Sequence, residues 1–175
     1  MPSFALAAIG RDRPGIVAAV ARVLFEQGCN VEDSSMTLLR GNFAMMLVLA
    51  SPAGTTRDAL DAALRPSCAE IGLTYDLLDV EDTADVPHPS HVLTVYGADR
   101  PGILYRVTEV LASAGVNITD LNSRLVGVDE PVYALLLELG IPSTTSAGDV
   151  EQQLTAVAKE IGVDLTLRVR EDDVL

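Results

Sequence analysis

The residues best placed to do chemistry lie in a short loop that occurs twice in the chain. Its first copy is Gly10-Arg11-Asp12-Arg13-Pro14-Gly15-Ile16-Val17, and its second is Gly97-Ala98-Asp99-Arg100-Pro101-Gly102-Ile103-Leu104. Each copy joins an apolar run typical of a strand to a segment with helical spacing of apolar residues. The first backbone N–H groups of a helix have no internal partner and can receive a carboxylate. The loop therefore indicates a candidate anion site that the chain builds twice.

Side chains around the loop could bind the other groups of a small zwitterion. The aspartates could face an ammonium group, and an asparagine after each helix offers both a donor and an acceptor. Glycine has no Cβ and lets a ligand approach the backbone. A free α-amino acid carries both charges. The candidate ligand-binding residues are Asp12, Arg13, Gly15, Ile16 and Asn30 in the first copy, and Asp99, Arg100, Gly102, Ile103 and Asn117 in the second.

The same residues also have a purely structural interpretation. The two aspartates could cap the helix or favour its dipole, and the two prolines could occupy its first turn. The glycines could serve simply to permit a tight turn, and the asparagines could simply adopt the backbone conformation that follows a helix end. The arginines could be surface charges. The residue types and their spacing leave both interpretations open.

The repeat extends well beyond the loop. At an offset of 87 (97 − 10), 12 of the 24 positions from Gly10 to Asp33 are identical to their counterparts. An internal duplication of this length predicts two units of about eighty residues each. We expect the first domain at residues 1–82, a linker at 83–90 in an acidic and proline-bearing stretch, and the second domain at 91–175.

Apolar periodicity predicts the same order of elements in each copy. The first copy has a strand at 4–9, a helix ending at Gly28, a hairpin of strands at 30–39 and 43–50, a helix ending at Gly72 and a strand at 74–80. The second copy has strands at 91–96, 116–126, 132–139 and 164–170, and helices at 101–114 and 148–161. Its hairpin turn is three residues longer, because the offset changes from 87 to 90. The order βαββαβ predicts an α+β fold of two ferredoxin-like units, each a four-stranded antiparallel sheet with two helices on one face.

Composition narrows the classes of function. The net charge of −13 and the pI near 4.3 disfavour direct binding of nucleic acid or an anionic membrane. The chain has no metal-ligand cluster and no phosphate-binding glycine motif, so we expect no metal, no cofactor and no catalysis. Cys29 and Cys68 are interpreted as buried thiols of a reducing cytoplasm, and the lack of a long apolar run predicts a cytoplasmic protein.

The loop sequence Asp-Arg-Pro-Gly-Ile, followed by Gly-x-Asn-Ile/Val and an apolar hairpin, resembles the ACT domain over almost the whole chain. The resemblance implies binding of an amino acid, such as glycine or serine, between units. It further implies a ligand-responsive transcriptional regulator that acts through a partner protein. The family also includes units that bind nothing, so a ligand-free interaction or oligomerisation module is the alternative. In both cases we expect a homodimer, since small units with exposed sheet edges commonly associate.

Overall fold

The computed structural model describes residues 1–80, 88–127 and 131–170, and the chain divides into two compact units, Met1–Thr83 and Ala84–Leu175. The elements of the first unit are β1 (Ser3–Arg11), α1 (Ile16–Glu26), β2 (Asn30–Leu39), β3 (Asn42–Ala50), α2 (Arg57–Ile71) and β4 (Thr74–Val80). Those of the second are β5 (His91–Ala98), α3 (Ile103–Ser113), β6 (Asn117–Val126), β7 (Val132–Gly140), α4 (Ala147–Ile161) and β8 (Val163–Val169).

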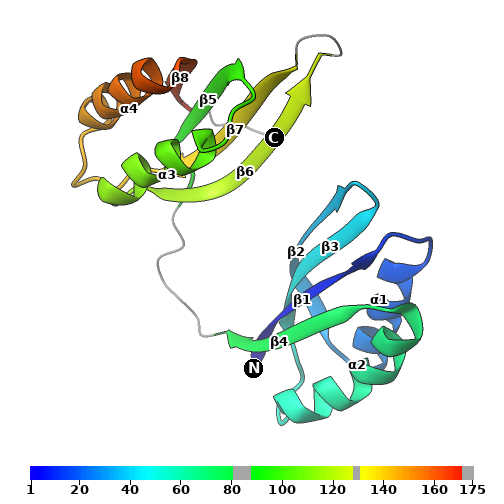
Figure 1. Cartoon of the computed structure of the whole chain (residues 1–175). Helices are drawn as coiled ribbons and strands as arrows, with labels where there is room; N and C mark the ends of the chain where they lie inside the picture. The colour runs from blue at the N-terminus through cyan, green and yellow to red at the C-terminus, as the bar shows by residue number, and fades with distance from the viewer. Residues whose placement is uncertain (81–87, 128–130, 171–175) are drawn as a thin grey trace. The chain divides into compact units, whose positions relative to one another are not determined.

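Each unit is one antiparallel sheet covered by two helices (Figure 1). The strand orders are β2-β3-β1-β4 and β6-β7-β5-β8, so the first strand of each unit lies in the centre of its sheet. This confirms the predicted α+β fold of two βαββαβ units. Five residues, 127–131, connect the second hairpin and two residues, 40 and 41, connect the first. The predicted extra three residues therefore lie in the turn.

Strand alternation divides each sheet into a helical face and an outer face. On β1, Phe4, Leu6 and Ala8 are buried in one cluster with the apolar stripes of α1 and α2, whereas Ile9 is 55% exposed on the opposite side. The second unit repeats this arrangement, with Leu93 fully buried under α3 and α4. Among the described residues, neither helix of a unit covers the outer face of that unit's sheet.

The first helix of each unit begins later than the sequence suggests. Gly15 is the N-cap of α1 with φ 93°, and Gly102 is the N-cap of α3 with φ 97°. A residue in this left-handed conformation cannot continue a right-handed helix, so Pro14 and Pro101 precede the cap and lie outside the helix. The expectation that they occupy the first turn is wrong. The helix ends predicted at Gly28 and Gly72 are confirmed, and both glycines are left-handed, with φ 70° and 67°.

The structure also bears on the two cysteines and on the ends of the domains. The described cysteines are both free thiols, but Cys68 is buried whereas Cys29 is half-buried, with its Sγ 3.2 Å from the Ser51 Oγ. Within the described ranges, no helix is both long and apolar enough to cross a membrane. Residues 83–87 of the predicted linker (83–90) and the acidic end of the chain (171–175) lie outside the described residues.

Candidate functional site

The repeated loop has the same backbone geometry in both units. Each loop leaves the central strand and turns into the helix through a glycine, Gly15 or Gly102, in the left-handed region. A Cβ placed on either glycine would meet no described atom within 4 Å outside the adjacent residues. Backbone conformation therefore requires glycine at these two positions, and the space beside each of them is open.

The N-termini of α1 and α3 carry free donors. The first intrahelical bonds run from the Ala19 N–H to the Gly15 carbonyl and from the Arg106 N–H to the Gly102 carbonyl, both at 2.9 Å. The three N–H groups before each of these donors have no acceptor inside the helix. Among the described residues no side chain caps either helix, and neither first turn contains an acidic residue. The alternative in which Asp12 and Asp99 cap these helices is therefore wrong.

The second helix of each unit shows what a capped terminus looks like in this chain. The Thr56 hydroxyl accepts the Ala59 N–H at 3.2 Å on α2, and the Ser146 hydroxyl accepts the Asp149 N–H at 3.3 Å on α4. Both helices also carry an aspartate in the first turn, Asp58 and Asp149. The open termini thus coincide with the repeated loop, and these are the ends that can still accept an external anion.

The glycine that begins each loop has a different role. A Cβ on Gly10 would lie 2.7 Å from the Leu73 Cδ2, and one on Gly97 would lie 2.6 Å from the Val163 Cγ1. These distances are too short for any real contact, so the central strand and the residue after the second helix approach closely only because no Cβ is present. Gly10 and Gly97 are packing residues rather than ligand contacts.

Asp12 is held next to the hairpin turn. Its backbone N–H donates to the Gly41 carbonyl at 3.0 Å, which ties the loop to the connection between β2 and β3. The Asp12 side chain is exposed, as is that of Asp99 in the second loop. From the sequence, Gly41 is predicted only as part of the Arg40-Gly41-Asn42 turn and not as a site residue. That turn must lie at the same end of the sheet as the loop, because β1 and β3 are antiparallel neighbours.

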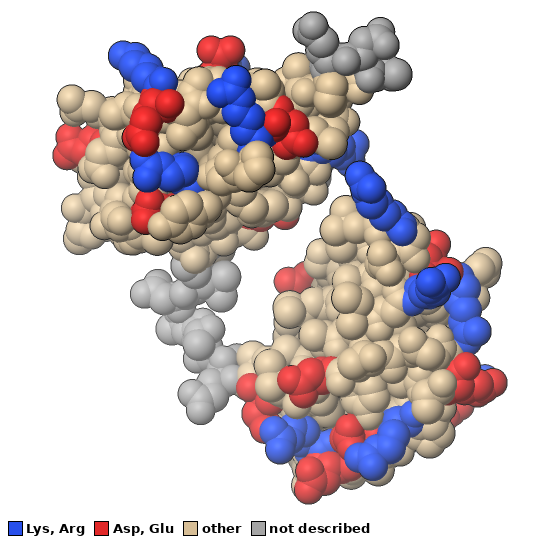
Figure 2. Space-filling model, in the orientation of Figure 1, with Lys and Arg blue, Asp and Glu red and all other residues tan. Residues whose placement is uncertain are grey.

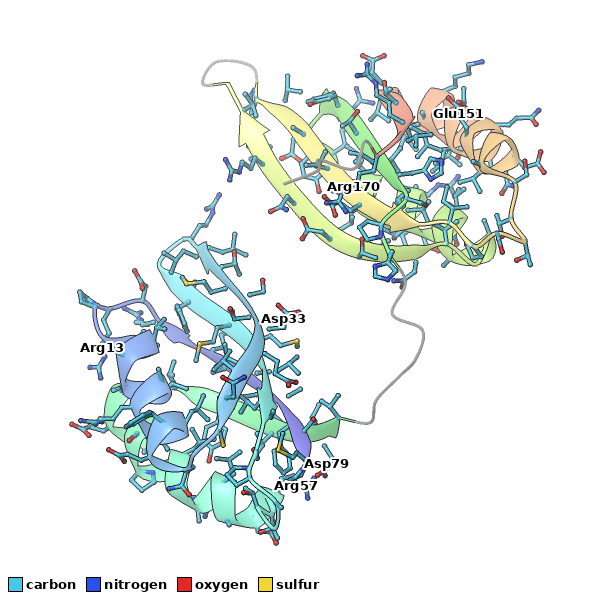
Figure 3. The ribbon with its side chains drawn as sticks, turned by 180° about the vertical axis from the view of Figure 1, so that it is seen from behind. Arg13, Asp33, Arg57, Asp79, Glu151 and Arg170 are labelled. Atoms are coloured by element: carbon cyan, nitrogen blue, oxygen red, sulfur yellow. The ribbon has the colours of Figure 1, made fainter. Side chains whose placement is uncertain are left out.

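The two loop arginines face their own units. The Arg13 Nη2 donates to the Glu70 carbonyl at 3.3 Å, in the last turn of α2 (Figure 3). The Arg100 Nη1 lies 3.9 Å from the point where a Cβ on Gly162, the C-cap of α4, would stand. A cation at this end of a helix interacts favourably with the helix dipole. Both arginines therefore have a structural contact, whatever else they bind.

In each unit the asparagine lies at the opposite end of the sheet from the loop. Asn30 pairs with Ala50, which pairs with Ser3 at the start of β1, whereas the loop follows the other end of β1. A nine-residue strand spans about 26 Å. Asn117 has the same position in the second unit, opposite Gly140. A small ligand that touches both a loop and an asparagine must therefore contact two units.

The isoleucines in the candidate set have buried side chains. Ile16 is 2% exposed and Ile103 is 4% exposed, and each packs in the core of its unit. Their side chains are therefore unavailable to a ligand, and only their backbone N–H groups can contribute. Together with the adjacent glycines, these N–H groups form the open helix N-termini.

A polar cluster outside the loops connects β4 to α2. The Tyr75 hydroxyl donates to the Asp61 Oδ1 at 2.6 Å, and Arg65 binds the other carboxylate oxygen of Asp61. Burial, then the hydrogen bond to Asp61, raises the pKa of Tyr75 to about 12. The hydrogen bonds from Tyr75 and Arg65 lower the pKa of Asp61. All three partners satisfy one another, which indicates a structural role.

Comparison with protein families identifies both units. The ACT domain model matches residues 4–77 and 91–168. The chain belongs to the ACT domain family. The matched ranges include both loops and most of both sheets, so the open helix N-termini described above are features of the two ACT units.

The chain is similar to proteins of different kinds. The chain is 28% identical over 168 residues to the glycine cleavage system transcriptional repressor of Escherichia coli K12, covering 94% of this chain and 88% of the repressor. It is 29% identical over 168 residues to the phosphoserine phosphatase SerB2 of Mycobacterium tuberculosis, covering 90% of this chain but 38% of the phosphatase. A solved structure of an unknown protein from Galdieria sulphuraria has a TM-score of 0.83 and 27% identity, with 97% and 99% of the two chains covered.

Proposed function

We propose that this tandem ACT protein is a regulatory amino-acid-binding protein that acts through a partner protein. The observation that carries the proposal is the repeated open helix N-terminus beside an unobstructed glycine, in a chain whose other two helices are capped. Similarity to a transcriptional repressor over nearly the whole of both chains supports the regulatory role. The match to a phosphatase over only 38% of that enzyme gives no support to catalysis.

The ligand we propose is a small amino acid, with glycine or serine first. Its carboxylate binds the free N–H groups of α1 or α3, where the helix dipole favours negative charge. Its ammonium group lies near the exposed carboxylate of Asp12 or Asp99. If Asn30 or Asn117 also contacts the ligand, that residue comes from a different unit. The similarity to a glycine cleavage repressor supports including glycine among the first ligands to test.

The regulatory output is a change in affinity for a partner protein. The net charge of −13 disfavours direct contact with an operator, so we propose a protein as the link to transcription. If the amino acid changes affinity for the partner, the partner changes affinity for the amino acid by the same factor. We retain the predictions of a cytoplasmic location and a homodimer as parts of this proposal.

The test is a titration of the purified chain with each of the twenty amino acids, followed by thermal shift and calorimetry. A ligand at a hundred times its dissociation constant stabilises the folded protein by about 2.7 kcal/mol. Gly15→Ala and Gly102→Ala, which place a methyl group in the open space of each loop, are expected to weaken binding at least tenfold at their own units. Gly54→Ala is the matched control, because Gly54 also has a left-handed φ, 88°, and an open Cβ direction, but lies outside the loops.

One observation favours a second candidate, a ligand-free interaction module. The hydrogen bond from Arg13 to the Glu70 carbonyl shows that part of the loop has a structural contact without any ligand. In that case all twenty titrations are flat, and the loop variants change stability by the same amount as Gly54→Ala. A saturable shift that the loop variants leave unchanged would instead show a ligand bound elsewhere.

A further inference from the structure

A polar groove lies on the second unit between α3 and the start of β6. It has a volume of about 540 Å³ and contains Asn117, one of the candidate ligand-binding residues. The other polar side chains that line it all belong to α3, and they are Tyr105, Thr108, Glu109 and Ser113. We call these five residues the α3 groove. A concave site of this size with a few polar groups is typical of a small-ligand pocket, and none of the four α3 side chains is predicted from the sequence as a site residue.

Glu109 is the one charged residue of the α3 groove, and its carboxylate is held in place. The Tyr105 hydroxyl donates to the Glu109 Oε1 at 2.6 Å, one helical turn away. The Glu109 Oε2 lies 3.7 Å from an Arg106 nitrogen, but Arg106 is closer to Glu160, at 2.7 Å. The space-filling view shows acidic and basic side chains next to one another on this unit (Figure 2). Because two carboxylates share one guanidinium, and the Glu109 side chain is 46% exposed, Glu109 can still accept hydrogen bonds from a cation.

The first unit has the opposite charge at the position of Glu109. At the offset of 87, the counterparts of Tyr105, Thr108, Glu109 and Ser113 are Ala18, Ala21, Arg22 and Glu26. The asparagine is retained as Asn30, but the three hydroxyl groups are lost, and with them the tyrosine that orients the carboxylate. The small Ala112 is replaced by Phe25, which is 81% exposed. The two equivalent surfaces therefore differ: the one beside Asn117 has an oriented carboxylate, and the one beside Asn30 has a cation in its place.

We propose that the α3 groove binds the ammonium group and the side chain of the amino acid, with Glu109 accepting hydrogen bonds from the ammonium and Asn117 donating to a ligand oxygen. This inference rests on the proposed function, since it takes the ligand to be an amino acid. It adds that the asparagine side of the site is built in the second unit only, because Arg22 repels an ammonium group at the equivalent place in the first. An ammonium group has three donors, so Glu109 can bind it together with a loop aspartate.

The hydroxyl group of Thr108 favours an amino acid whose own side chain bears a hydroxyl. It already donates to the Leu104 carbonyl at 2.9 Å, so it can only accept a further hydrogen bond. The side chain of serine can donate to this acceptor, whereas glycine and alanine have no side-chain donor. A groove of about 540 Å³ also has room for a side chain. Of the two ligands proposed first, the α3 groove therefore favours serine.

The test locates the ligand on the full chain by NMR. L-Serine is titrated into ¹⁵N-labelled protein, and dissociation constants are taken from the shifts of the backbone amides. We expect saturable shifts over residues 105–113 and at Asn117, and none at Asn30. Glu109→Gln should weaken serine binding about tenfold, because it replaces a charged acceptor with a neutral one of the same shape. Arg22→Gln, at the equivalent position of α1, is the matched control and should leave binding unchanged.

Ligand analogues separate the roles of the groove residues. 3-Hydroxypropionate lacks the ammonium group of serine, so the wild type should bind serine more tightly. Glu109→Gln should narrow this preference, and so should Tyr105→Phe, by less, because Tyr105 acts only by positioning Glu109. A purely structural role of Tyr105 would change stability but not this preference. Thr108→Val should weaken serine binding about threefold and leave alanine binding unchanged, since it removes one acceptor of the same size.

The outcomes distinguish this inference from the proposed function. If none of the twenty amino acids shifts an amide in either unit, both are wrong. If serine shifts the loops or Asn30 but not the α3 groove, or if Glu109→Gln binds serine as tightly as the wild type, this inference alone is wrong. Tighter binding of glycine or alanine than of serine overturns the preference for a hydroxyl. Far-UV circular dichroism of each variant ensures that a loss of binding is not a loss of folding.

Discussion

The two ACT units have the same order of strands and helices but different side chains at equivalent core positions. Register places Phe43 opposite Gly10 in the first unit and Tyr133 opposite Gly97 in the second. Phe43 is 2% exposed and fully in the core, whereas Tyr133 is only half-buried. The loops keep the same left-handed glycine in both units. Backbone conformation at the loop is therefore more tightly constrained than side-chain packing beneath it, and we expect stability and binding to respond to different residues.

The largest difference is expected from truncating the two equivalent aromatics. Phe43→Ala should lower the free energy of unfolding of the first unit by about 3–5 kcal/mol, because it leaves a cavity in the core. Tyr133→Ala should cost its unit about 1–3 kcal/mol, since that ring is already half-solvated. Urea unfolding followed by hydrogen exchange assigns each loss to its unit. Equal losses would show that the two cores are equally dependent on this position.

Adding a methyl group to the packing glycines should have the next largest effect. Gly97→Ala should destabilise the second unit by about 1–3 kcal/mol, because its Cβ would lie 2.6 Å from the Val163 Cγ1 and 3.3 Å from the Val163 Cα. Gly10→Ala should cost less, since its nearest contact, the Leu73 Cδ2, is the end of a longer side chain, and its nearest backbone contact is the Gly72 carbonyl oxygen at 3.0 Å. Thermal unfolding of both variants measures the order, and a greater loss in Gly10→Ala contradicts it.

The tyrosine cluster makes the first unit sensitive to alkali. The pKa of Tyr75 rises from 10.0 to about 12 in the folded state, so the protonated phenol stabilises the fold below pH 10 and this contribution is lost as pH rises to about 12. Tyr75→Phe should cost about 1 kcal/mol at neutral pH and remove the loss above pH 10. Register places Tyr75 opposite Ala8 and Leu165 opposite Val95, so the second unit has no tyrosine at this position; its alkaline sensitivity should come instead from Tyr105, whose pKa the hydrogen bond to Glu109 raises. Urea midpoints at pH 9 and pH 11 test both statements.

The smallest effect is expected from a surface ion pair that only the second unit has. Arg106 donates to Glu160 at 2.7 Å, and the two side chains are 36% and 63% exposed. Glu160→Gln should destabilise that unit by about 0.2–1 kcal/mol, less at high salt. The control is Glu70→Gln, because Ala19 occupies the corresponding position to Arg106 in the first unit. A loss of the same size in Glu70→Gln would mean that the ion pair is not its cause.

Helix capping shows why some local predictions were wrong. Asp12 before a helix is a reasonable cap by residue type, and Pro14 is a reasonable first-turn residue. Gly15 overrides both, since its positive φ delays the helix to Ile16 and leaves the aspartate on the loop. The residue types of Asp12, Pro14 and Gly15 alone do not reveal which of them will be the N-cap. The close contact of Gly10 with Leu73 was also invisible, because the two residues lie 63 positions apart in the chain.

The sequence by itself determined the duplication, the order of strands and helices and the length of the second hairpin turn, because these depend on periodicity and on spacing between neighbours along the chain. Only the tertiary structure decided which candidate residues meet. It joined Asp12 to Gly41, turned Arg13 to the end of α2 and set Asn30 a full strand length from its own loop. It also decided which side chains share the outer face of each sheet, because strand register, rather than proximity in sequence, determines this.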